Sequence, residues 1–247
     1  MAFGLKSRLM AGGTVLLSLC SAAGAQESAN SGGLALNLIV EAVEKAQSAV
    51  HPQFPYQVLR EYRLSGSNSS NVVVEVNFRP PTSKDYRIQR SSGSKRGEQV
   101  VRNLLDHEVD TTSSRSKTKT AITRENYDFA YIGDEVSDGQ ACYVLEIKPK
   151  RKEKDLIAGK AWIDKRSFLV RRIEGEISKT PSWWLKKVRV KLSFGDYEGT
   201  WLQSSMEAVA DVRIVGLHTL TSQILDYRGT DEVVSAQNQT HSSVRRH

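Results

Sequence analysis

The sequence contains only two cysteines, and their positions argue against an internal disulfide in the mature protein. Cys20 lies within an N-terminal apolar segment that we expect to be removed, and Cys142 lies in an apolar run that favours a buried, inert thiol. A single remaining cysteine has no partner within its own chain. The fold is therefore expected to depend on packing and hydrogen bonds rather than on covalent cross-links.

Motifs that would identify an enzyme or a metal site are also missing. The histidines show neither His-Glu-x-x-His nor His-x-His spacing, and the chain has no Gly-x-Ser-x-Gly elbow and no P-loop. Asp128, Glu174 and Glu176 are the carboxylates that an acid–base mechanism would use. Turn hydrogen bonds for Asp128 and an exposed strand face for the two glutamates are the simpler interpretations. We therefore expect a protein that is not an enzyme and that carries no metal or cofactor.

The first 25 residues have the pattern of a secretory signal peptide. Lys6 and Arg8 precede an apolar stretch of about eleven residues, and the small residues of Ala23-Gly24-Ala25 form a cleavage site. The alternative is a retained anchor helix, which Gly12 and Gly13 disfavour because they interrupt an already short stretch. We predict export to the periplasm.

Cys20 raises the further possibility of a lipid anchor. Leu19, the residue before it, is larger than the small residue that usually precedes a lipidated cysteine. We therefore favour removal of Cys20 together with the leader.

Negative charge is the scarcer sign, with 28 Asp and Glu against 35 Lys and Arg. Much of the excess lies in residues 115–124 and 148–154, and such runs can bind nucleic acid or anionic headgroups. A solvated turn is the simpler interpretation of 148–154, because Pro149 follows a strand pattern. Since the sequence has no zinc-finger spacing and no RNA-binding aromatic signature, we expect no nucleic-acid partner. An anionic membrane surface is the partner that these runs would fit.

Hydrophobic periodicity divides the mature chain into two helices and about ten strands. Apolar residues recur at helical steps over residues 34–50 and 97–109. Residues 26–33 fit a flexible N-terminus, 230–247 a disordered tail, and 111–124 either a loop or a polar helix. Period-two patterns predict strands at Val58–Leu64, Val72–Phe78, Tyr86–Arg90, Tyr127–Gly133, Ala141–Lys148, Leu156–Asp164, Phe168–Ile177, Lys187–Phe194, Trp201–Ile214 and Leu217–Tyr227.

These elements predict an α+β fold with a curved antiparallel sheet. Strands that have one polar and one apolar face are typical of antiparallel sheets, and about ten of them in meander order cannot stay flat. We therefore predict a half-open barrel of about 10–11 strands, covered by the two helices, as a single domain over residues 34–229. The apolar stripes of the helices would face the concave side. Wherever side chains do not fill that space, an apolar cavity is enclosed.

Several segments of the sequence, in this order, resemble one family. They are Asn126–Phe129, Tyr143–Leu145 followed by 149–152, Gly159–Asp164, Val170–Gly175, Pro181–Trp184 and Leu220–Tyr227. Over residues 34–228 the chain resembles the LolA-like fold of periplasmic lipoprotein carriers, in the branch labelled outer-membrane lipoprotein-sorting protein. The resemblance implies an incomplete barrel, covered by helices, around an acyl-binding cavity. It also implies an arginine that latches the lid helices, for which Arg60 and Arg63 are both candidates.

The function predicted from these observations is that of a non-catalytic carrier. It would be a monomer that shields the acyl chains of lipoproteins, or another hydrophobic ligand, from water. The residues predicted to line the cavity or its lid are Val101, Leu104, Leu105, Phe129, Trp162 and Trp184. Ordinary core packing is the alternative interpretation of the tryptophans. The alternative function is a protein-interaction module of the same fold, such as a sensor of envelope stress.

Overall fold

The computed structural model describes residues 23–50, 52, 54–112, 120–180, 185–213 and 216–229, with side chains from residue 35 onward. The chain divides between Ala35 and Leu36 into two units, and the second carries the whole sheet. Most of the predicted signal peptide, the predicted tail and Trp184 lie outside the described residues. Among the residues that are described, no helix combines the length and the apolar composition needed to cross a membrane.

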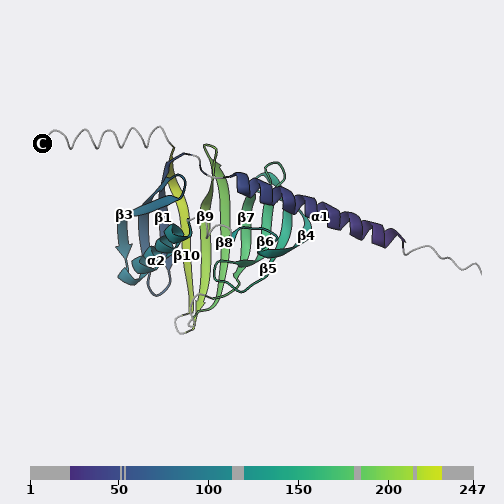
Figure 1. Ribbon diagram of the computed structural model, residues 1–247. Coiled ribbons are helices and arrows are strands. Elements are labelled where there is room, and N and C mark those ends of the chain that lie inside the picture. The colour runs from purple at the N-terminus through teal and green to yellow at the C-terminus, as the bar shows by residue number, and fades with distance from the viewer. Residues whose placement is uncertain are drawn as a thin grey trace, which may run out of the picture. The chain divides into compact units, whose positions relative to one another are not determined.

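Ten antiparallel strands form one open sheet in the order β3-β2-β1-β10-β9-β8-β7-β6-β5-β4 (Figure 1). Neighbours in the sheet are neighbours in the chain except where β1 pairs with β10. Consequently β3 and β4, which follow one another in the chain, form the two edges. The strands are β1 (Tyr56–Ser65), β2 (Ser70–Arg79), β3 (Ser83–Gly93), β4 (Tyr127–Ser137), β5 (Gln140–Pro149), β6 (Ile157–Asp164), β7 (Val170–Ile177), β8 (Leu185–Tyr197), β9 (Thr200–Val212) and β10 (Gly216–Arg228).

The predicted fold class, an α+β half-open barrel covered by helices, is confirmed, and each of the ten predicted strands corresponds to one observed strand. The helices are α1 (Ala23–Ala49) and α2 (Lys95–Thr111). α1 begins earlier than its apolar pattern predicted, so the backbone is helical across residues 26–33, where we expected a flexible segment. Between α2 and β4, residues 113–119 lie outside the described part.

Both helices lie on the same face of the sheet (Figure 1), and each packs on a hydrophobic cluster there. The first core cluster joins Val40 and Val43 of α1 to the inward residues of β4–β7. The second joins Val101 and Leu105 of α2 to β1 and β2. No described residue of β9 is fully buried. The middle of the sheet is therefore covered less completely than the two regions beneath the helices.

A pair of glycines brings β6 and β7 unusually close together. Gly159 and Gly175 lie opposite each other in the ladder. A Cβ atom at Gly159 would lie 2.1 Å from the carbonyl oxygen of Glu174, and one at Gly175 would lie 2.2 Å from that of Ala158. Both distances are far below van der Waals contact, so only glycine fits here without a shift of the backbone.

Alanine at Gly159 is therefore expected to lower the free energy of unfolding by about 1–3 kcal/mol, the usual cost of overpacking. Urea denaturation followed by circular dichroism measures the change. Gly195→Ala is the matched control, because a Cβ there would meet nothing closer than Tyr197 Cε2 at 3.9 Å. We expect a change within about 0.5 kcal/mol for this control. Equal losses in the two variants would contradict the close approach.

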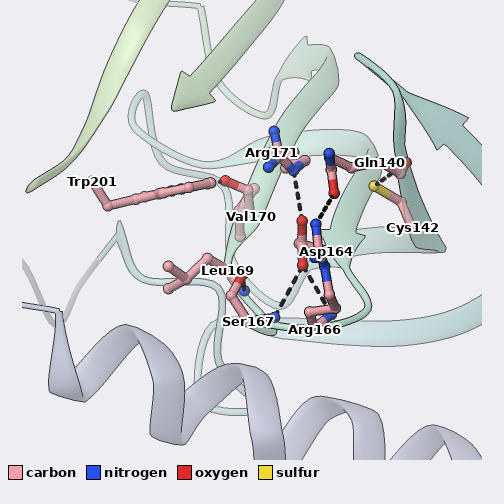
Figure 2. Close-up of polar contacts among 9 residues, drawn as sticks. All are labelled: Gln140, Cys142, Asp164, Arg166, Ser167, Leu169, Val170, Arg171 and Trp201. Carbon is pink, nitrogen blue, oxygen red and sulfur yellow. Dashed lines mark hydrogen bonds and ion pairs between the residues drawn. The ribbon is translucent and has the colours of Figure 1, made fainter. Parts of the chain in front are cut away.

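The turn from β6 to β7 is organised by one buried carboxylate, that of Asp164 (Figure 2). Its Oδ1 accepts hydrogen bonds from the backbone N–H groups of Arg166 and Ser167, at 2.8 and 3.0 Å. Its Oδ2 accepts from Arg171 Nε at 2.7 Å. The guanidinium of Arg171 in turn lies 5.5 Å from the ring centroid of Trp201, whose indole N–H donates to the carbonyl of Val170. The turn thus fixes one wall of the cavity described next.

Candidate ligand-binding site

A cavity of about 630 Å³ lies between the two core clusters, on the helix-covered face of the sheet. Its floor is apolar and comes from both halves of the sheet. β1 and β2 contribute one side, and β7, β8 and β9 contribute the other. The apolar and aromatic residues of this floor are Tyr56, Val58, Val76, Phe78, Leu169, Val170, Ile173, Phe194, Trp201 and Leu202.

The roof of the cavity is more polar than its floor. It comes from the C-terminal half of α1, the end of α2 and residues 120–123. Gln47 donates to the carbonyl of Ile122 at 2.9 Å. Glu44 accepts a backbone hydrogen bond and a side-chain hydrogen bond from Arg124, at 2.6 and 2.9 Å. These bonds tie α1 to the segment that precedes β4.

Three charged side chains from three elements meet on the cavity wall: Arg60 of β1, Lys84 of β3 and Glu108 of α2. We call them the polar cluster. Arg60 is only 6% exposed, and its Nη1 lies 3.6 Å from Glu108 Oε1. Lys84 Nζ donates to the same carboxylate oxygen. Arg60 Nη2 also donates to the carbonyl of Gln203 in β9 at 2.9 Å. One carboxylate of α2 thus bridges two cations on the sheet.

The protonation states of this region follow from burial and from the neighbouring charges. Burial acts to raise the pKa of Glu108, but the ammonium of Lys84 and the guanidinium of Arg60 outweigh it and hold that pKa below its ordinary value. Burial, together with the negative charge of Glu108, raises the pKa of Tyr62 to about 12, although Arg60 opposes the shift. At neutral pH the polar cluster therefore carries two positive charges and one negative charge.

Arg60 and Arg63, the two candidates for a latch, differ in what they contact. Arg63 pairs at 2.9 Å with Glu61 of its own strand, and its side chain is 60% exposed. Arg60 points to the opposite face, as a spacing of three residues requires in a strand. In the described part of the chain, Arg60 is the one of the two that pairs with a helix residue, Glu108 of α2. The geometry needed to restrain α2 is therefore found at Arg60.

Three residues of α2 and Phe129 of β4 were predicted to line the cavity or its lid, and none of them lines the cavity. Val101 and Leu105 are fully buried in the second core cluster, and Leu104 packs against that cluster. Phe129 packs against the first core cluster. None of these four is among the residues that line the cavity. They support the helix and the strands that frame it, and direct contact with a ligand stays a prediction for them.

Trp162 lies on the face of β6 opposite to the one we expected. Its neighbours in the strand, Ala161 and Ile163, belong to the first core cluster beneath α1, so Trp162 points away from the helices. It packs with Cys142 and Val144, and its indole N–H donates to Glu135 at 2.8 Å. The guanidinium of Arg172 covers the ring at 3.7 Å. This tryptophan is buried against the outer face of the sheet, which corresponds to the core-packing alternative.

Sequence reasoning missed the polar cluster, although a signal for it was present. Arg60 occupies an inward position of a strand in which the other inward residues, Val58 and Tyr62, are apolar. Glu108 similarly follows Val101 and Leu105 on the apolar stripe of α2. A charge at a position that the alternation reserves for apolar residues indicates a buried partner or a ligand.

The other polar candidates have ordinary roles in the described part of the chain. Asp128 is exposed and lies 3.7 Å from Lys150. Glu174 pairs with Arg172 and Lys191 on the outer face of the sheet. Among the described residues, no group of three or more His, Cys, Asp or Glu side chains is placed to hold a metal ion.

Comparison with known proteins gives matches at the level of fold. A family model described as "-like: Uncharacterized protein" matches residues 109–218. No curated protein matches the sequence. An outer membrane lipoprotein-sorting protein domain from Vibrio parahaemolyticus is 13% identical, with a TM-score of 0.41, and the match covers 77% of this chain and 91% of that one.

Two further solved structures show similar coverage. A LolA superfamily protein from Nitrosomonas europaea is 14% identical with a TM-score of 0.34, and the match covers 76% of this chain and 91% of that one. The MucA/MucB complex from Pseudomonas aeruginosa includes a chain that is 12% identical with a TM-score of 0.26, with 79% and 97% covered. Two of these structures carry names of the family that the sequence resembles. At these identities the likeness concerns the fold alone.

Proposed function

We propose that the protein is a non-catalytic, exported carrier that shields an acyl chain, or another hydrophobic ligand, from water. The observation that supports this proposal is the cavity of about 630 Å³, whose floor is apolar and whose roof comes from two helices. Cavities that bind small ligands typically measure about 300–1,000 Å³ and are lined mainly by apolar side chains. A carrier needs no reacting groups, only a dry surface and a way to release its cargo.

The strength of such binding makes a release step necessary. Burying an acyl chain of about fourteen carbons contributes on the order of 10 kcal/mol at roughly 0.8 kcal/mol per methylene. Release on a useful timescale then requires the roof to move. Polar contacts hold the roof at the cavity: Glu44 with Arg124, Gln47 with Ile122, and Glu108 with the sheet. Apolar residues also anchor each helix in a core cluster, so we expect the roof to open at the polar contacts while the clusters stay packed.

Filling the cavity is expected to weaken ligand binding without unfolding the protein. Leu202 lines the cavity from β9 and is only half-buried, so Leu202→Trp adds bulk to the floor. We expect its affinity for a fluorescent fatty-acid probe to fall about tenfold or more, as expected when about 1.4 kcal/mol of binding is lost. Fluorescence titration of the purified protein measures this change.

Leu225→Trp is the matched control for this experiment. Leu225 is 47% exposed in β10, and the substitution adds the same bulk to a surface outside the cavity. Its affinity is expected to stay within about twofold of the original protein. Failure of the unsubstituted protein to bind the probe, together with native mass spectra free of any ligand, would refute the carrier function.

A second candidate function, a protein-interaction module, is favoured by one separate observation. The edge strand β4 exposes three large apolar side chains, those of Tyr131, Ile132 and Val136. An unpaired edge with apolar residues is a surface to which another chain can add a strand. The same titration separates the two functions, because an interaction module needs no probe binding in the cavity.

A further inference from the structure

We propose that the cavity selects amphiphiles that have one apolar chain and one anionic head group, and that Arg60 binds this head group. The inference rests on the proposed carrier function and deepens it by naming a class of ligand. It is argued from the charge balance of the polar cluster and from the unused donors of Arg60.

The polar cluster has one more positive charge than negative charge. Arg60 and Lys84 share the single carboxylate of Glu108. The other carboxylate that lines the cavity, Glu44, is engaged by Arg124 in the roof. Tyr56 and Tyr62 keep their protons, because burial raises the pKa of each phenol. Among the described residues, one positive charge in this largely apolar cavity is therefore left without a counter-charge.

Arg60 also has donors that the described residues do not use. A guanidinium has five N–H groups arranged for planar, two-point recognition of carboxylate or phosphate. Nη2 donates to Gln203, but Nη1 lies too far from Glu108 for a hydrogen bond, at 3.6 Å. Nε lies beside the phenol of Tyr62, has almost no accessible surface and makes no hydrogen bond of good geometry in the described part of the chain. Nη1 is therefore the donor that an anionic ligand in the cavity would meet, and a buried donor is costly unless such a partner is supplied.

The surroundings of the polar cluster determine the rest of the ligand. Val58, Val76 and Phe78 line the cavity beside Arg60, and Ile173 and Phe194 line it from the other half of the sheet. An acyl chain fits this apolar floor, and a head group with a single charge matches the single excess positive charge. Carboxylate and phosphate diester both meet this requirement. In surroundings with a low dielectric constant, a charge-assisted hydrogen bond discriminates strongly against an uncharged head.

The test compares ligands that share a chain and differ in the head. Hexadecanoate, lysophosphatidylglycerol with a sixteen-carbon chain, and uncharged hexadecanol compete with an uncharged fluorescent apolar probe, each below its aggregation concentration. The pH is set above the pKa of the fatty-acid carboxyl. We expect at least one anion to bind about ten- to a hundredfold more tightly than hexadecanol. The two anions separate a carboxylate source from a phospholipid source.

Arg60→Gln is expected to remove this preference by lowering the affinity for the anions to about that for hexadecanol. Arg63→Gln is the matched control, since it removes the same charge from the same strand on the exposed face. It should leave the preference intact. Lys84→Gln is a second variant of the cluster and should weaken anion binding through the lost charge. It also keeps the test decisive if Arg60→Gln does not fold, and circular dichroism reports the fold of each variant.

The outcomes distinguish this inference from the function on which it rests. If no ligand displaces the probe from the unsubstituted protein, the carrier function itself fails. If hexadecanol binds as tightly as both anions, the carrier function stands and the head-group site is refuted. If Arg63→Gln removes the preference as fully as Arg60→Gln does, the effect comes from net charge, and the site is likewise refuted.

Discussion

Asp164→Asn is expected to lower the free energy of unfolding by about 3 kcal/mol, the usual cost of breaking a buried ion pair. Asparagine has nearly the same shape, and its oxygen can still accept the two backbone hydrogen bonds of the turn. What is lost is the charge that Arg171 pairs with at 2.7 Å, where only 4% of the Asp164 side chain is exposed. Denaturant unfolding of both proteins at neutral pH measures the difference.

The same carboxylate gives this difference a specific dependence on pH. Burial acts to raise the pKa of Asp164, but hydrogen bonds from Arg171 and from the backbone of Ser167 and Arg166 outweigh it and lower the pKa to about 2, from 3.8. A lowered pKa means that the charged form stabilises the folded state above pH 4 and that this contribution disappears as the pH falls through about 2. The shift corresponds to roughly 2 kcal/mol.

The gap in stability between the original protein and Asp164→Asn should therefore narrow by about that amount between pH 4 and pH 2. Other carboxylates titrate in this range too, but they are common to both proteins and cancel in the comparison. Asp128→Asn is the control, since Asp128 is exposed and only 3.7 Å from its nearest cation. It is expected to change stability by at most about 0.5 kcal/mol at any pH. A pH-independent gap for Asp164→Asn would contradict the assignment of a low pKa.

The sheet could be predicted from the sequence because a strand's period of two is a local property. In β2, the inward residues Val72, Val74, Val76 and Phe78 alternate with Val73, Glu75 and Asn77, and these four inward residues belong to the second core cluster beneath α2. The meander order followed from the short turns between strands. The β1–β10 pairing, in contrast, joins segments more than 150 residues apart. No local pattern determines this pairing, because it depends on how all ten strands arrange in the sheet.

The site was harder to predict, because the residues that line a cavity are those that the core clusters leave uncovered. The predicted α2 residues are apolar, and because of this they pack in the second core cluster and do not line the cavity. Trp162 was predicted to line the cavity or its lid, but strand parity puts it beside Cys142 on the outer face of the sheet. The residues left to line the cavity are those between the clusters. Their identity depends on the positions of two helices relative to the sheet, which no local pattern contains.

Glu108→Gln tests whether the polar cluster holds α2 to the sheet. The substitution keeps the shape of the side chain but leaves Arg60 and Lys84 facing each other without a counter-charge. We expect a loss of about 3 kcal/mol in unfolding free energy. We also expect the substitution to speed amide hydrogen exchange more in α2 than in β5 or β6. Glu98→Gln is the control on the same helix. Its carboxylate is partly exposed, pairs with Arg102 of the same helix and accepts a hydrogen bond from Ser91 of β3, so we expect a clearly smaller loss for this variant.

Replacing the whole cluster separates stability from selectivity. A triple variant, Arg60→Met, Lys84→Met and Glu108→Leu, removes all three charges and fills their space with apolar atoms. Buried ion clusters replaced in this way often lose no stability and can gain about 1–4 kcal/mol. We therefore expect the triple variant to have a free energy of unfolding at least as large as that of the original protein. It should also bind hexadecanol more tightly and show no preference for an anionic head group. If the triple variant is as unstable as Glu108→Gln, the polar cluster stabilises the fold. If the triple variant regains stability and loses its preference for anions, the three charges serve ligand recognition, at a site where apolar residues would give a more stable protein.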